Sequence, residues 1–90
     1  MKSILQSKED GCLICGNPYT EEHHVFFGTA NRSLSERYGM KVYLCAEHHR
    51  GKRGAHQDRD LDLLLKKMAQ KKFEETYTED FVSVFGRSYR

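Results

Sequence analysis

The strongest constraint on this chain is the run 44–50, which reads Leu-Cys-Ala-Glu-His-His-Arg. Cys45 and His48 have two residues between them, the spacing at which a chain turning into a helix can offer two ligands to one zinc ion. His49 follows at once and projects at a different angle, so it cannot share that ion comfortably. The run therefore predicts two separate sites that meet in one turn of the chain.

A pair of cysteines near the start of the chain completes the first site. Cys12 and Cys15 are also separated by two residues, and Gly16 after them can adopt the positive φ that ligand-bearing turns often need. With Cys45 and His48 they form a Cys₃His set, the closed tetrahedral shell that structural zinc prefers. The alternative is three unrelated buried cysteines, which the paired spacing disfavours. We expect Zn²⁺ to fasten the start of the domain to the second strand.

The pattern around these ligands predicts a small α+β fold. Short β-branched and aromatic runs indicate two antiparallel strands, at 22–27 and 40–45. The polar connector between them can form one or two helical turns over 31–38, and another helical turn is expected at 46–50. The expected core is therefore an antiparallel hairpin plus a helix, with zinc at its base.

The C-terminal part of the chain is typical of helix. A helix is expected from Asp58 or Asp60, either of which can cap it, to about Tyr77. Its apolar stripe recurs at helical spacing and comprises Leu61, Leu64, Leu65, Met68, Ala69 and Phe73. Thr78 is expected to cap a shorter helix that places Phe81, Val84 and Phe85 on one side and stops at Gly86. These helices, at about 59–86, extend a core at about 10–58 within one domain, 1–90.

Composition limits the class of protein. The 90 residues are 38% hydrophobic and 31% charged, with a formal net charge of +2. No apolar run approaches the roughly 20 residues that span a bilayer. An odd number of cysteines, one of them beside histidines, favours metal binding in a reducing compartment over disulfides. We therefore expect a cytoplasmic protein with no membrane partner, and the sequence leaves monomer or dimer open.

Four histidines lie outside the zinc set: His23, His24, His49 and His56. Side chains alternate along a strand, so one of the first two can bind a metal ion while the other acts on water. Asp58 is a candidate carboxylate to orient His56. The alternative is a pair of ordinary strand histidines and a solvent-exposed His56. Basic side chains near the cluster would hold nucleic-acid phosphates and comprise Arg50, Lys52 and Arg53, with Arg32 and Arg37.

This frame of cysteines and histidines resembles the HNH endonucleases, also called the ββα-metal or His-Me finger group. The resemblance is carried by His23 and His24, by the run 44–49, and by the first cysteine pair. It covers roughly half of the chain by motif. Among phage and prophage members, the chain is similar to the recombination-enhancement nucleases that work with RecA. The implied fold is a zinc-stapled ββα-metal domain with a C-terminal helical extension.

The resemblance also implies a role for each residue. His24 matches the general base that activates water, His23 the metal ligand before it, and His49 the metal ligand on the helix, with His56 as a second candidate. The implied catalytic ion is Mg²⁺ or Mn²⁺. The middle asparagine of the family pattern is absent, because residues 40–43 read Met-Lys-Val-Tyr. A backbone carbonyl or Asn31 would then have to orient the base.

The implied function is a metal-dependent endonuclease that nicks or cuts DNA with little sequence preference, in phage recombination or DNA processing. A RecA-type recombinase filament is the implied protein partner. One alternative is a zinc-binding nucleic-acid module without activity, and alanine at His24 would distinguish it. A second is a zinc-stapled interaction domain whose partner surface is made of Phe73, Tyr77, Phe81, Phe85 and Tyr89.

Overall fold

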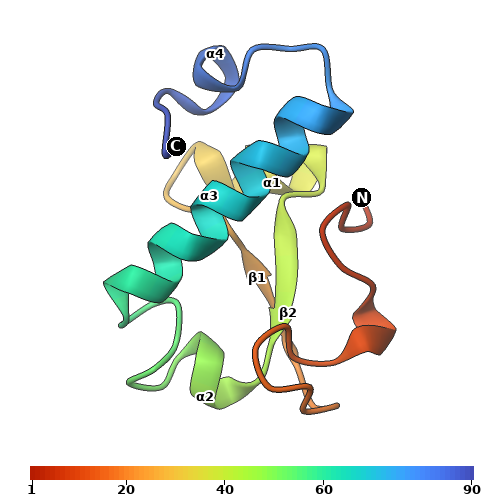
Figure 1. The fold of residues 1–90 in the computed structure, drawn as a ribbon, viewed down its shortest axis with the longest axis vertical. Helices are drawn as coiled ribbons and strands as arrows, with labels where there is room; N and C mark the ends of the chain where they lie inside the picture. The colour runs from red at the N-terminus through yellow and green to blue at the C-terminus, as the bar shows by residue number, and fades with distance from the viewer.

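Two short strands lie at the centre of the fold in the computed structural model, which describes residues 1–90. The elements in order are η1 Lys8–Asp10, β1 Glu21–His24, α1 Asn31–Tyr38, β2 Lys41–Leu44, α2 Ala46–His49, α3 Arg59–Thr76 and α4 Phe81–Phe85. The strands pair antiparallel, and α1 and α2 lie at opposite ends of the pair while α3 crosses in front of it (Figure 1). The α+β class, the antiparallel pair and the helices are as expected. No helix has the length and apolar composition to cross a bilayer.

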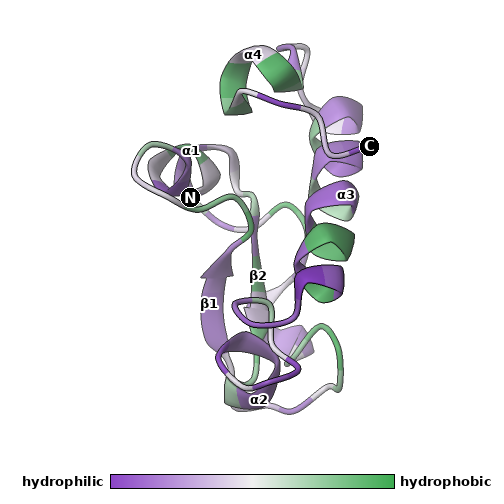
Figure 2. Ribbon diagram, turned by 90° about the vertical axis from the view of Figure 1, so that its left-hand side faces the viewer, coloured by the Kyte–Doolittle hydropathy of each residue, from purple (hydrophilic) through white to green (hydrophobic).

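The two strands differ in character. β1 reads Glu-Glu-His-His and is hydrophilic along its length (Figure 2), whereas β2 carries the hydrophobic Val42 and Leu44. Both are shorter than the predicted 22–27 and 40–45. After β1 the Val25 amide still donates to the Met40 carbonyl, but the chain then leaves the sheet and buries Val25 and Phe26. A strand of four polar residues contributes little to the core, so its side chains are available for a site.

Three of the five C-terminal aromatics, Phe73, Phe81 and Phe85, fill the core instead of forming a partner surface, while Tyr77 and Tyr89 are partly buried at its edge. The Phe26 ring lies 5.1 Å from the Phe81 ring and 4.6 Å from the Phe85 ring, and Phe73 packs on the same pair. These side chains are almost fully buried. The cap of α4 is Asp80, which accepts from the Ser83 amide, and the prediction of Thr78 is wrong. Asp80 immediately precedes the buried Phe81, whose packing fixes where the helix begins.

The apolar stripe of α3 is narrower than predicted. Leu65, Ala69 and Phe73 are buried, but Leu64 is 60% exposed and Met68 is 36% exposed. The helix crosses the two strands at one side only, so the outer flank of the stripe has nothing to pack against. Gln70 is buried instead, where its Oε1 accepts from the Tyr89 amide at 2.7 Å and holds the C-terminal tail on the helix.

The cap of α3 is Asp58, whose Oδ1 accepts from the amides of Asp60 and Leu61 at 2.9 and 3.1 Å. Asp58→Ala is therefore expected to lower the free energy of unfolding by about 1 kcal/mol, because two amides lose their acceptor. Asp60→Ala, which removes no cap, should cost less. Urea denaturation followed by circular dichroism measures both. Equal losses in the two variants would contradict this assignment of the cap.

The N-terminal segment, to which the sequence pattern assigns no role, covers the free edge of β2. The Tyr43 amide donates to Gln6 Oε1 at 2.8 Å, and the Tyr43 carbonyl accepts from the Leu13 amide at 2.9 Å. An unpaired strand edge is a template for unwanted pairing. The same contacts carry the cysteine turn that starts at Cys12 to the base of β2.

Candidate functional site

The four predicted zinc ligands meet at one point. The ligand atoms of Cys12, Cys15, Cys45 and His48 all lie within 4.8 Å of one another. Cys15 Sγ is 3.7 Å from Cys45 Sγ, and His48 Nδ1 is 3.2 Å from Cys45 Sγ and 3.7 Å from Cys12 Sγ. Tetrahedral zinc with Zn–S bonds of about 2.3 Å places two sulfurs about 3.8 Å apart. The cluster therefore has the donors and spacing of a structural zinc site, and all three cysteines are free of disulfides.

The backbone prepares one of these thiols for metal binding. Burial of Cys12 opposes ionisation, but hydrogen bonds from the backbone of Cys45, Cys15 and Ile14 outweigh it and lower the pKa of Cys12 to about 6. The turn that supplies the last two of these is closed by the Gly16 amide, which donates to the Cys12 carbonyl at 2.8 Å. Gly16 has a φ of +79°, as its position predicts. Since the thiolate is the form that binds metal, this turn favours the metal-binding state.

The short helix α2 separates two clusters. His48 and His49 are consecutive, and successive side chains on a helix point about 100° apart. His48 faces the cysteines, while His49 belongs to a second group with His23 and His56. The ligand atom of His49 therefore lies apart from the cysteine cluster.

In the second group, the His49 ring is hydrogen-bonded to a carboxylate. Its Nδ1 lies 2.7 Å from Glu21 Oε1, so Nδ1 carries the proton and the Nε2 lone pair is free. That Nε2 lies 3.2 Å from His56 Nε2. The loop after α2 folds back to place His56, and its approach requires Gly54, where a Cβ would lie 2.7 Å from the His49 backbone. Glu21 was missed by sequence reasoning, whereas Asp58, expected behind His56, caps α3 instead.

The third imidazole, His23, is buried and lacks a hydrogen-bond partner. Only 1% of its surface is exposed, and its Nε2 has no partner. Burial first, and then the nearby His56 and His49, lower the pKa of His23 to about 3, so the ring is neutral at neutral pH. Its ring centre lies 5.2 Å from that of His49 and 5.0 Å from that of His56. A buried, unpaired nitrogen facing two others is costly unless something binds there, and a metal ion fits the donors.

His24 lies on the opposite face of β1, as the alternation of the strand predicts, among charged side chains. Its Nε2 is 2.9 Å from Glu36 Oε1 on α1, and Glu36 also accepts from Lys41 Nζ at 3.1 and 2.9 Å. Glu22 pairs with the same lysine at 3.3 Å. Hydrogen bonds from the amino group of Met1, from His24 and from Lys41 hold the pKa of Glu36 well below its usual range.

The two faces of β1 open into a common hollow. A hollow of about 240 Å³ is lined by Glu22, His23, His24, Phe27, Arg32, His49 and His56. A wider groove of about 880 Å³ adjoins it and is lined by His24, Phe27, Gly28, Thr29, Arg32, Ser33, Glu36, Arg37 and His56. His24 and His56 line both. The three-histidine cluster and His24 therefore border the same hollow.

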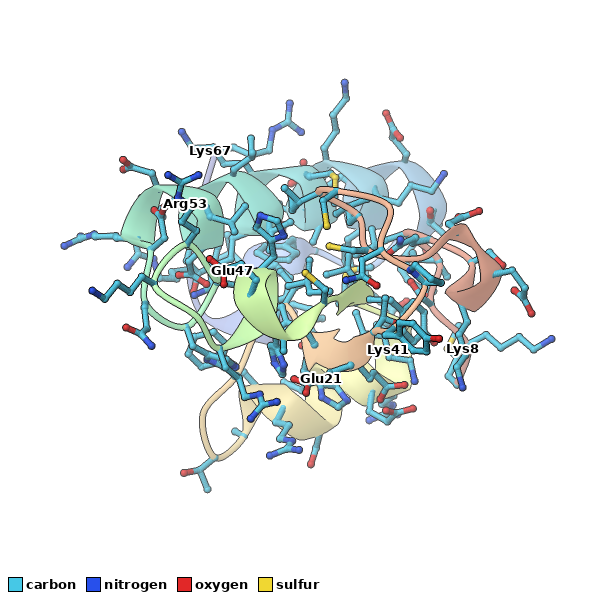
Figure 3. The ribbon with its side chains drawn as sticks, turned by 90° about the horizontal axis from the view of Figure 1, so that it is seen from below. Lys8, Glu21, Lys41, Glu47, Arg53 and Lys67 are labelled. Carbon is cyan, nitrogen blue, oxygen red and sulfur yellow. The ribbon has the colours of Figure 1, made fainter.

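The basic side chains divide into three sets. Arg32 and Arg37 line the wider groove. Arg50 instead pairs with Glu21, its Nη2 lying 2.6 Å from Oε2. Lys52 and Arg53 are exposed on the loop after α2 and line neither hollow. Glu21, which contacts His49, lies on β1. Lys41, which pairs with the Glu36 carboxylate beside His24, lies on the neighbouring strand β2 (Figure 3).

Comparison with models of protein families, with curated protein sequences and with solved structures finds no match to this chain.

Proposed function

We propose that this protein is a metal-dependent endonuclease of the HNH type, which hydrolyses DNA phosphodiester bonds. The observation that supports the proposal best is the convergence of three imidazoles, one with a buried and unpaired Nε2, on a hollow that His24 also lines. The strand pair followed by α2 is consistent with a ββα-metal arrangement. The cysteine cluster would hold a structural zinc ion with no open position.

The donor set of the second cluster favours one class of ion. His23, His49 and His56 offer three imidazole nitrogens and no carboxylate. Imidazole suits Mn²⁺ less well than Co²⁺, Ni²⁺ or Zn²⁺, and Mg²⁺ prefers oxygen ligands. Of the two ions expected from the sequence, Mn²⁺ therefore fits better than Mg²⁺. A divalent ion held here would neutralise charge that develops on a phosphodiester.

In the proposed reaction, His24 takes the proton of the attacking water. A neutral imidazole has a lone pair that can accept a proton from water. Arg32 and Arg37, on the groove beside it, would hold phosphates on either side of the bond, which positions the strand without reading its sequence. Arg50 is already neutralised by Glu21, so it would contribute less.

The test is cleavage of supercoiled plasmid and single-stranded DNA by purified protein, with EDTA or with Mg²⁺, Mn²⁺, Co²⁺ or Ni²⁺. Cleavage is expected with the transition ions, weakly with Mg²⁺, and not with EDTA. His56→Ala removes one of the three ligands of the divalent ion. The ion concentration needed for half-maximal cleavage should therefore rise by about 10-fold or more. Calorimetry measures the affinity of the zinc-loaded protein for the same divalent ions, and so compares the variant with wild type independently of cleavage.

A matched variant is His49→Ala, which should have the larger effect because Glu21 orients His49. An unchanged ion requirement in both variants would exclude this cluster as the ion site. The assay should include DNA coated with a RecA-type recombinase, since we infer that such a filament is the partner that presents the substrate. DNA binding without cleavage under all of these conditions would favour the alternative of a zinc-binding module without activity.

A further inference from the structure

The sequence lacks the asparagine that orients the base histidine in the HNH pattern, and the structure offers a different group. Asn31, one expected substitute, lines neither hollow. Glu36, five residues further on and in α1, reaches back to β1 and lies 2.9 Å from His24 Nε2. No spacing rule links a helix residue to that strand, so only the fold brings the two together.

The chemistry of the contact fixes where the proton lies on His24. An ionised carboxylate can only accept hydrogen bonds, so His24 must donate from Nε2 to Glu36. The neutral ring then has its lone pair on Nδ1. A carboxylate on one ring nitrogen fixes the tautomer and orientation of an imidazole in the same way in metal sites and in hydrolases.

Lys41 keeps Glu36 in place. Its side chain is only 6% exposed, and its ammonium group pairs with both Glu36, at 2.9 Å, and Glu22, at 3.3 Å. The two carboxylates differ in their relation to His24. Glu36 lies within hydrogen-bond distance of Nε2, whereas the nearest oxygen of Glu22 is 3.6 Å away. Glu22 therefore shares the lysine but not the hydrogen bond to the histidine.

We propose that Glu36 is a positioning residue that holds His24 in the tautomer with Nδ1 free, and that Nδ1 is the atom that accepts the proton. This inference rests on the proposed function for the role of His24 as base. The carboxylate of Glu36, on the helix α1 that connects the two strands, then takes the place of the missing asparagine.

Glu36→Gln tests the hydrogen bond with His24 separately from the contact with Lys41. Lys41 can only donate, so the amide oxygen is expected to face Lys41 and the amide NH₂ to face His24. His24 Nε2 must then accept, and the ring proton moves to Nδ1, the atom needed for the reaction. We expect kcat to fall by about 10²- to 10³-fold, with KM within about 3-fold of wild type.

Glu22→Gln is the matched control. It also removes one negative charge beside Lys41, but the hydrogen bond from His24 to Glu36 remains, so the ring proton of His24 should stay where it is in wild type. A shift of that proton in both variants would mean that pairing with Lys41 is what matters, and would overturn the proposal.

A second readout does not depend on cleavage. Long-range ¹H–¹⁵N correlation spectra of the zinc-loaded protein report which ring nitrogen of His24 carries the proton. The expected result is Nε2–H in wild type and Glu22→Gln, and Nδ1–H in Glu36→Gln. An unchanged tautomer in Glu36→Gln overturns the proposal. If the tautomer changes in that variant but the wild-type protein cuts no DNA, the positioning role of Glu36 is supported. Only the proposed nuclease function is then contradicted.

Discussion

Cys45→Ser is expected to leave the protein largely unfolded at room temperature. Structural zinc in small domains contributes about 10–16 kcal/mol of folding free energy, whereas a whole domain is stable by only about 5–15 kcal/mol. Cys45 is buried and is the single residue between β2 and α2, so its loss frees both elements at once. Circular dichroism and near-ultraviolet spectra of the variant, with zinc analysis of wild type at about one tightly held ion per chain, check this prediction.

The control is Glu47→Ala, in the same short helix but exposed and not a ligand, which should fold and bind zinc as wild type does. A strong chelator added to wild type should reproduce the effect of Cys45→Ser, and added zinc should reverse it. A thermal transition that the chelator does not shift would show that the cysteine cluster does not hold the fold together.

His24→Ala is expected to lower the rate of DNA cleavage by about 10²- to 10⁴-fold, the usual contribution of a general base. Its ring lines the hollow beside the three-histidine cluster but is not part of that cluster. Ion binding and DNA affinity should therefore remain within about 3-fold of wild type. Single-turnover cleavage and fluorescence anisotropy with a labelled oligonucleotide measure the two quantities separately.

Raising the ion concentration distinguishes the base from a ligand. Excess ion should restore cleavage by His56→Ala, because a weakened site can still be filled by mass action. It should not restore His24→Ala, which lacks the group that takes the proton. Full cleavage by His24→Ala, or its recovery with excess ion, would assign His24 to the metal site and leave the base unidentified.

The ligand frame could be predicted from the sequence because its spacing is characteristic of metal ligands. Two pairs separated by two residues each predict the convergence of the cysteines with His48, and helical geometry turns His49 away from them. The position of the long helix α3 could be predicted as well, because its apolar residues recur at helical spacing and Asp58 is a suitable cap at its start. The prediction was wrong for Leu64 and Met68, because periodicity gives the direction of a buried face and not its width.

The carboxylates of the site could not be predicted in this way. Glu21 and Glu36 are two of many acidic residues in a highly charged chain, and nothing in their spacing marks them. Each acquires its role through a tertiary contact: Glu21 because β1 passes beside α2, and Glu36 because α1 packs back on β1. The absence of the middle asparagine can be seen in the sequence, but the group that replaces it depends on the fold.

The consecutive positions of His48 and His49 have a consequence for how the molecule tolerates change. A single turn of helix orients one ring toward the thiols and the next toward the reactive hollow. One residue inserted between them would swing the later ring by about 100° and remove it from Glu21. The length of this turn is therefore fixed by both clusters, and a change in the cysteine cluster is expected to disturb the three-histidine cluster next to it.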